Sequence, residues 1–178
     1  MTGRLRLVLR LLAVPVLVLC SSRASAHPSP FSYIDLDLRG DGVYGTLVAH
    51  VLDLGHDVGV SPAERLLDPL VLAQYATRIE GLLGPRLRIQ AAGVSEPQWT
   101  AIEAVSEQQA IKMSFVLHVG NAGSVTVQPR MFPYDPLDQS FVNVFQNGQL
   151  KQQFVFPGDS ARQTFYAGPT PGGLAVMA

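Results

Sequence analysis

The architecture of this chain is predicted by one stretch, VTVQPRMFPYDPLDQSFVNVFQNGQLKQQFVF, which runs from Val125 to Phe156. Two strand-like segments flank an elbow, Phe132–Pro136, whose two prolines each fix their own φ and bias the preceding residue toward extended backbone. Another strand is expected over Phe141–Phe145, and Asn147-Gly148 is a strong two-residue hairpin signal that leads into a return strand. The stretch therefore predicts β structure built from hairpins.

A second hairpin is expected well before the elbow. In Phe31–Leu38, the side chains of Ile34, Leu36 and Leu38 alternate with others on the opposite face, which predicts a half-buried strand with these three residues inward. A glycine-rich turn follows, and the pattern resumes as a second strand over Val43–Leu52.

The sequence predicts one substantial helix. Asp53–Val60 is interpreted as a loop, and Ser61–Glu64 carries the cap, first-turn proline and N3 glutamate of a short helical turn. Asp68 with Pro69 repeats that signature and starts the main helix, which is expected to run from Pro69 to about Leu83.

Strand-like segments account for most of the remaining chain, and their spacing of about 8–12 residues favours a sandwich over a parallel α/β sheet. The fold class predicted is mainly β: an antiparallel sandwich or open barrel of about 7–9 strands with one main helix at about 69–83. The further strands are expected at 86–91, 98–105, 110–119, 124–131, 140–146, 150–156 and 163–166.

The first 26 residues have the features of a cleaved secretory signal. Three arginines precede a ten-residue apolar segment, Leu11–Cys20, which is shorter than the ~20 residues needed to cross a bilayer. Ala24-Ser25-Ala26 fits the small-x-small cleavage rule, and an uncleaved N-terminal anchor is the alternative. The expected organisation is a signal peptide at 1–26, a β-rich extracytoplasmic domain at 27–167, and an exit linker at 168–178.

Composition narrows the function classes. Removing 26 of the 178 residues leaves nine basic and 14 acidic residues, a net charge of −5, and no basic cluster in the sequence suggests nucleic acid. The single cysteine, Cys20, leaves with the signal, so no disulfide is expected and the hydrophobic core must hold the domain.

Several segments resemble the exported N-terminal domain of the HupE/UreJ-type family of bacterial proteins, in which such a domain precedes a polytopic membrane domain. They are Phe132–Pro136, Gln139–Phe145, Phe165–Gly168, and His27-Pro28 directly after the signal. The resemblance implies a periplasmic location, a membrane-domain partner, and a link to nickel or another metal through the family's membrane part. That part is not in this sequence, so the chain is expected to be a truncated or split member.

The histidines are the candidate metal ligands. After cleavage, His27 would offer an imidazole and a free α-amine, and a third nitrogen from the strand residues His50 or His118 would complete a site that Cu(II) accepts. The predicted metal residues are therefore His27, His50 and His118, with copper or nickel as the ion. His56, in the expected loop, is a weaker candidate, and the alternative is that all four are polar or hydrogen-bonded surface residues.

Sequence signatures of enzymes are missing: there is no Gly-x-Ser-x-Gly elbow, phosphate loop or His-Glu-x-x-His helix, and no small-molecule substrate is indicated. Asp135 and Asp138 are interpreted as turn formers, with a weak calcium site as the alternative. The prediction is a non-enzymatic sensing, docking or metal-handling module of a HupE/UreJ-like membrane protein. The alternative is a free periplasmic copper- or nickel-binding protein that uses an N-terminal histidine.

Aromatic side chains are dense in the last third of the chain, and two interpretations stay open for them. They either fill the core of the sandwich or form an apolar rim that docks onto a membrane domain. The residues are Phe132, Tyr134, Phe141, Phe145, Phe154, Phe156, Phe165 and Tyr166.

Overall fold

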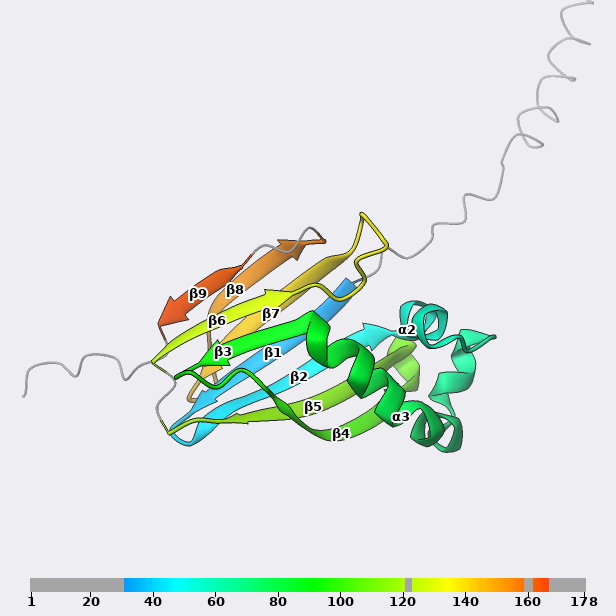
Figure 1. The fold of residues 1–178 in the computed structure, drawn as a ribbon, viewed down its shortest axis with the longest axis horizontal. Helices are drawn as coiled ribbons and strands as arrows, with labels where there is room; N and C mark the ends of the chain where they lie inside the picture. Colours follow the sequence, from blue (N-terminus) through cyan, green and yellow to red (C-terminus); the bar gives the residue numbers. More distant parts are fainter. Residues whose placement is uncertain (1–30, 121–122, 159–161, 167–178) are drawn as a thin grey trace, which may run out of the picture.

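Strands dominate the computed structural model, which describes residues 31–120, 123–158 and 162–166 (Figure 1). Nine strands lie in two sheets within these residues, and the main helix packs with them. The predicted class, a mainly β sandwich with one main helix, is confirmed. The predictions of a signal peptide at 1–26 and an exit linker at 168–178 lie outside the described residues. No helix in the described part is long and apolar enough to cross a membrane.

The larger sheet has six strands in the order β4-β5-β2-β1-β7-β8. Their bounds are β1 Phe31–Arg39, β2 Gly42–His50, β4 Gln98–Val105, β5 Ala110–His118, β7 Gln139–Gln146 and β8 Gln149–Pro157. Both predicted hairpins form, and Asn147 and Gly148 adopt the positive φ values of 54° and 71° that their turn requires. The pairing of β1 with β7 is parallel, and the chain between these two strands forms the helices, β2, β4 and β5 of the same sheet, and β3 and β6 of the smaller sheet.

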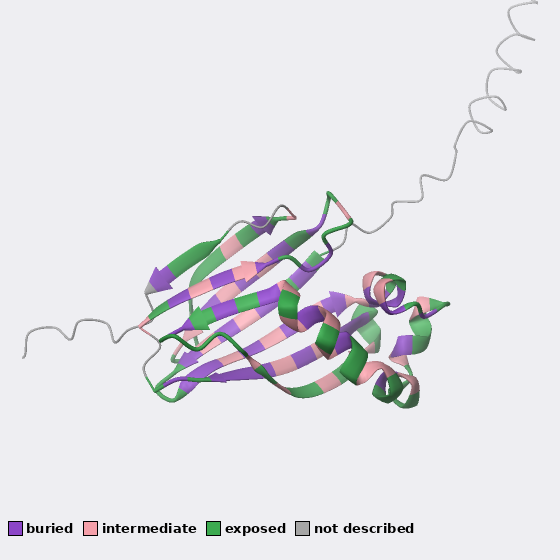
Figure 2. Cartoon of the chain, viewed as in Figure 1, coloured by how far each residue is buried: buried purple, intermediate pink, exposed green. Residues whose placement is uncertain are grey.

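The smaller sheet has three antiparallel strands in the order β3-β6-β9. They are β3 Leu87–Ala91, β6 Ser124–Pro129 and β9 Gln163–Tyr166, and the last matches the predicted bounds. The strands alternate between buried apolar and exposed polar residues, so one face packs on the core and the other faces solvent (Figure 2).

The main helix, α3, runs over Pro69–Leu83 as predicted, and the side chain of Asp68 caps it by accepting a 2.8 Å hydrogen bond from the Leu70 N–H. The predicted short turn before it is η1, a 3₁₀ helix over Ala63–Leu67. Two further 3₁₀ turns are η2 at Gly84–Arg86 and η3 at Ser106–Gln108.

The loop predicted over Asp53–Val60 is wrong, because a second helix, α2, spans Val51–Val58. β2 accordingly ends at His50 rather than at residue 52. The His50 side chain accepts a hydrogen bond from the Leu52 N–H and caps the helix, and Gly59 ends it with a φ of 69°. Burial of Val51, Leu54 and Val58 on one face stabilises this short helix against its neighbours in the fold.

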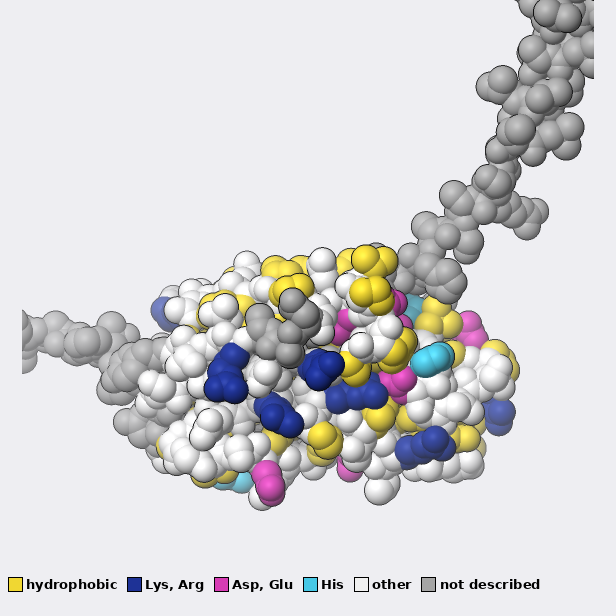
Figure 3. Space-filling model, turned by 45° about the horizontal axis from the view of Figure 1, so that its top comes forward, with side chains coloured by type: hydrophobic (Ala, Val, Ile, Leu, Met, Phe, Trp, Pro, Cys, Tyr) yellow, Lys and Arg dark blue, Asp and Glu magenta, His cyan; other side chains and the backbone are white. Residues whose placement is uncertain are grey.

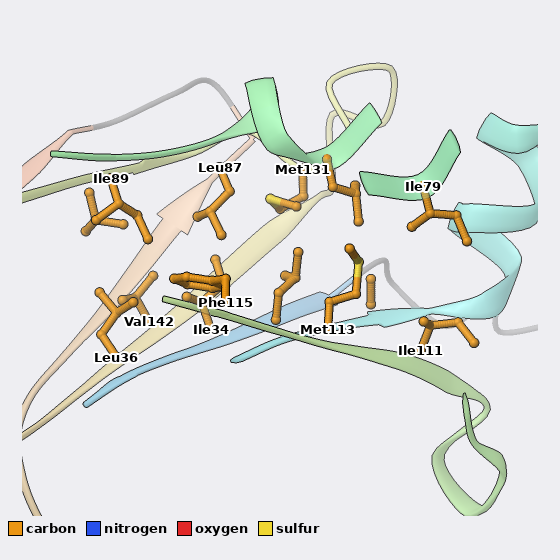
Figure 4. Packing of buried hydrophobic residues seen from close by; sticks show 14 of the residues in the cluster. Ile34, Leu36, Ile79, Leu87, Ile89, Ile111, Met113, Phe115, Met131 and Val142 are labelled. Atoms are coloured by element: carbon orange, nitrogen blue, oxygen red, sulfur yellow. The ribbon is translucent and has the colours of Figure 1, made fainter. Parts of the chain in front are cut away.

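Apolar side chains from both layers meet in one continuous core (Figure 4). Ile34 and Leu36 are fully buried, as predicted from their alternation. Gly45 makes room for the ring of Phe115, because a Cβ at this glycine would lie 2.1 Å from Phe115 Cζ. A side chain at position 45 would therefore clash with the Phe115 ring, so the packing of the core requires a glycine there.

The aromatics of the last third divide between the two interpretations. Phe132, Phe156 and Phe165 are buried in the core, whereas Tyr134 is exposed and Phe141 is half-buried on the outer face of the larger sheet. Burial of Tyr166 lies outside what the structure describes.

Candidate functional site

One end of the sandwich collects exposed apolar side chains. At this end β1 and β7 begin and β2 and β8 finish, since Phe31 pairs with Gln139 and Gln139 pairs with Pro157. Nine large hydrophobic residues are exposed in the described part of the chain, and six of them lie here. We call this surface the apolar end; it comprises Phe31, Tyr33, Leu52, Tyr134, Leu137 and Val155, with the half-buried Phe141 among them.

The centre of the apolar end is an aromatic stack on the outer face of the larger sheet. The rings of Tyr33 and Phe141 stack with centroids 5.3 Å apart, and Phe31 meets Phe141 edge-on at 5.6 Å. Tyr33 is 49% exposed, and Val155, which pairs with Phe141 on β8, is 58% exposed. The aromatic stack therefore offers preformed apolar area to a partner.

A row of polar side chains borders the aromatic stack on the same face of the larger sheet. Asn143 donates a 2.8 Å hydrogen bond from Nδ2 to Asp35 Oδ1, and Gln153 donates a 2.9 Å bond to Asn143 Oδ1. The row crosses β1, β7 and β8 one step beyond Tyr33 and Phe141. The larger sheet thus changes from apolar to polar within a few residues along each strand.

The proline elbow forms the rim of the apolar end. Asp135 Oδ1 accepts a 2.8 Å hydrogen bond from the Leu137 N–H, and Asp138 Oδ2 accepts a 3.0 Å bond from the Phe132 N–H. Their predicted role as turn formers is confirmed. Asp138 is buried, and its Oδ1 has no hydrogen-bond partner among the described residues. These residues contain no group of three or more His, Cys, Asp or Glu side chains suited to hold a metal ion.

An arginine fastens the elbow to α2. Arg86 Nη1 donates to Asp57 Oδ2 on α2 and, at 2.7 Å, to the carbonyl of Met131 beside the elbow. The Asp57 carboxylate is 7% exposed, so this ion pair is largely shielded from water. His56 adds a ring contact with Tyr134, with centroids 4.6 Å apart. The elbow and α2 are therefore held together as one unit.

Negative charge accumulates at the same place, as the acidic side chains near the elbow in Figure 3 show. Burial, with the nearby carboxylates of Asp138 and Asp135, raises the pKa of Asp53 to about 6. Burial also raises the pKa of Asp138, although its hydrogen bond from Phe132 opposes the shift. The pKa of the Tyr134 hydroxyl is raised, mainly by burial. The charge of Asp53 therefore changes near pH 6 rather than near its usual value.

The structure does not bring the predicted metal ligands His50 and His118 together. His50 ends β2, while His118 pairs with Gly42 at the start of β2, so the two lie about 26 Å apart at the rise of a strand. Nδ1 of His50 accepts the α2 cap bond, and burial lowers the pKa of this imidazole. His56 lies on α2 rather than in a loop, and His27 is outside the described residues.

No family model and no curated protein matches this chain.

The membership predicted from the HupE/UreJ resemblance therefore stays a prediction. Sequence reasoning found the elbow but missed its partners on α2, Asp53 and Asp57, because that segment was interpreted as a loop. The apolar spacing of Val51, Leu54 and Val58 was the signal for the helix. The carboxylates of the elbow accept hydrogen bonds from backbone N–H groups, and the Asp57 carboxylate pairs with Arg86. These contacts hold the elbow and α2 in place at the apolar end.

Proposed function

We propose that this chain is a non-enzymatic, exported module that docks through the apolar end onto a protein of the membrane. The observation that carries the proposal is the gathering of six of the nine exposed large hydrophobic residues at one end of the sandwich. Single exposed apolar residues are ordinary on a soluble domain, but their concentration at one end of a domain is typical of an interaction site.

The local architecture supports a contact surface. Tyr33 and Phe141 stand on paired strands, and Tyr134 stands on an elbow that Arg86 fastens to α2. Side chains fixed in this way lose little conformational entropy when a partner covers them. Large aromatics surrounded by a polar rim are also the residues that contribute most of the binding free energy in protein interfaces.

The apolar end also lies away from the end of the last strand. Tyr166 pairs with Ser124 at the start of β6, whereas the other end of β6 leads through Arg130 into the elbow. β9 therefore ends on the side of the smaller sheet opposite the apolar end. This arrangement favours contact with a separate polypeptide or a distant segment over contact with the residues that directly follow the domain.

A membrane co-fractionation experiment tests the proposal. The exported protein carrying Tyr33→Ser and Phe141→Ser should be lost from the membrane fraction of cells that express the partner, whereas Leu150→Ser should behave as wild type. Leu150 is a fair control because it is 47% exposed on β8 and pairs with Phe145, at the opposite end of the larger sheet from the apolar end. Equal membrane association of all three proteins would contradict docking through this surface.

A second candidate function, copper or nickel binding by an N-terminal histidine, is favoured by one observation. Ser32 pairs with Ala49, so Phe31 continues the register opposite His50. His27 is four Cα–Cα steps from Phe31, and these steps span at most about 14 Å. His118 lies at the far end of the sheet, so of the two strand histidines it is His50 that lies within reach of the N-terminus.

Electron paramagnetic resonance of the Cu(II)-loaded mature protein tests this second candidate. Nitrogen hyperfine structure should weaken in His50→Asn and remain in His118→Asn. Asparagine is a good N-cap, so the first variant keeps α2 capped while it removes the imidazole. One extra residue before His27 should also abolish the signal, and identical spectra for all proteins would refute the site.

A further inference from the structure

The outer face of the smaller sheet carries a row of arginines. Arg88 on β3 pairs with Gln128 on β6, and Arg162, directly before β9, continues the β6–β9 register opposite Gln128. Arg130 follows on the same side of β6, two residues along. Lys and Arg side chains are accordingly gathered over this sheet in Figure 3. Residues far apart in the sequence therefore form one cationic surface.

This surface is hollowed. A groove of about 690 Å³ is lined by Arg88, Arg162, Thr126 and Gln128, with Glu96 as its only acidic residue. A second hollow of about 380 Å³ continues from Arg88 and Gln128 to Arg130 and the elbow residue Pro133. The first volume lies within the usual range for small-ligand sites, about 300–1,000 Å³.

Within the part of the chain that the structure describes, the three arginines have no carboxylate at ion-pair distance. None of Arg88, Arg130 and Arg162 forms an ion pair with a described residue, whereas Arg86, two residues before Arg88, is paired with Asp57. The predicted mature chain is acidic overall, so a concentration of guanidinium groups on one face is not a consequence of composition. Like charges on neighbouring strands repel each other unless an anion lies between them.

We infer that this groove, which we call the arginine groove, binds a phosphate-bearing ligand. Guanidinium groups bind phosphate oxygens through paired N–H donors, and a multivalent oxyanion can contact more than one of them. Arg88 and Arg162 lie two strand spacings apart, about 10 Å between backbones, and long side chains converge over that distance. The Thr126 hydroxyl, which bonds the Thr164 hydroxyl at 2.9 Å, lies in the next row and adds a neutral hydrogen-bonding group.

The same chemistry is available from a soluble phosphate compound or from the headgroup of an anionic phospholipid. Titration with inorganic pyrophosphate and co-sedimentation with phosphatidylcholine vesicles, with and without phosphatidylglycerol, distinguish the two sources. A site for soluble phosphate predicts binding of pyrophosphate without binding of either vesicle. A site for the headgroup predicts binding of the phosphatidylglycerol vesicles, and release from them when pyrophosphate is added.

Matched variants show whether the arginine groove is responsible. Arg88→Gln with Arg162→Gln should weaken the binding observed by about ten-fold or more, as loss of two charge-assisted contacts implies. Arg65→Gln with Arg78→Gln removes the same charge from exposed positions on η1 and α3 and should leave binding within about two-fold.

Thermal unfolding separates loss of the site from loss of the fold. Pyrophosphate, or phosphatidylglycerol headgroup analogues, should raise the Tm of wild type and of the control variant but not that of the groove variant. Without ligand, the groove variant should be at least as stable as wild type, because repulsion between arginines is relieved. Absence of binding to every probe, or equal loss in both double variants, would overturn the inference.

Discussion

The larger sheet presents stacked aromatic rings at one end of its outer face, whereas the smaller sheet presents arginines on its outer face. Both faces belong to one sandwich and share one core, so folding does not require either feature. Strand positions that face solvent tolerate most polar residues. The fold therefore does not require the stack of Tyr33 with Phe141, and it does not require arginines at positions 88 and 162. The two faces therefore offer different chemistry, apolar area on one and guanidinium groups on the other, and each carries a proposal of its own.

The largest expected effect comes from the residue that anchors the apolar end in the core. Phe132 is fully buried in the elbow, so Phe132→Ala should lower the free energy of unfolding by about 3–5 kcal/mol through the cavity it leaves. Tyr134→Ala, two residues away and 45% exposed, should cost about 1 kcal/mol or less. Urea denaturation of both variants measures this, and similar losses would show that the elbow is not anchored as described.

Arg86 and Arg88 sharpen the comparison, because they are two residues apart in the sequence, but Arg86 is half-buried at the end of η2 whereas Arg88 is exposed on β3. Arg86→Gln removes the partner of the shielded Asp57 carboxylate and should cost about 2–3 kcal/mol, less than for a fully buried pair. Arg88→Gln should change stability by no more than about 0.5 kcal/mol, because Arg88 has no ion pair with a described residue. Equal costs in denaturant titrations would mean that the arginine groove has a structural role.

A smaller effect, dependent on pH, is expected at Asp53. Its pKa is raised to about 6 in the folded protein, so the carboxyl group favours folding when protonated, and this contribution is lost as pH rises through about 6. Asp53→Asn should therefore stabilise the domain by about 1 kcal/mol at pH 8, after allowing for partial solvent exposure, and have little effect at pH 4. The exposed Glu107→Gln is the control, and a Tm difference independent of pH would contradict the assignment.

The sequence predicted those parts of the fold whose signals are local. Asp68 and Pro69 mark the start of α3, and Asn147 with Gly148 marks a hairpin, because a cap and a turn depend on adjacent residues. α2 was missed because Gly55 and Gly59 suggest a loop, and its stability comes from burial against distant strands.

The surfaces were harder to predict than the elements. The turn roles of Asp135 and Asp138 follow from neighbouring backbone groups and were predicted. The apolar end depends on the parallel pairing of β1 with β7, and the arginine groove depends on the order β3-β6-β9. Both bring together residues that are far apart in sequence, and no local pattern encodes such an order.

Site-specific photo-crosslinking in the native cell envelope tests the docking proposal most directly. A benzoyl-phenylalanine placed at Tyr33 should form an adduct with a membrane protein, and the same probe at Leu150, exposed at the opposite end of the larger sheet, should not. The adduct should disappear when Phe141→Ser is added to the Tyr33 probe protein. An adduct from Leu150 but not from Tyr33, or identical adducts from both positions, would contradict docking through the apolar end.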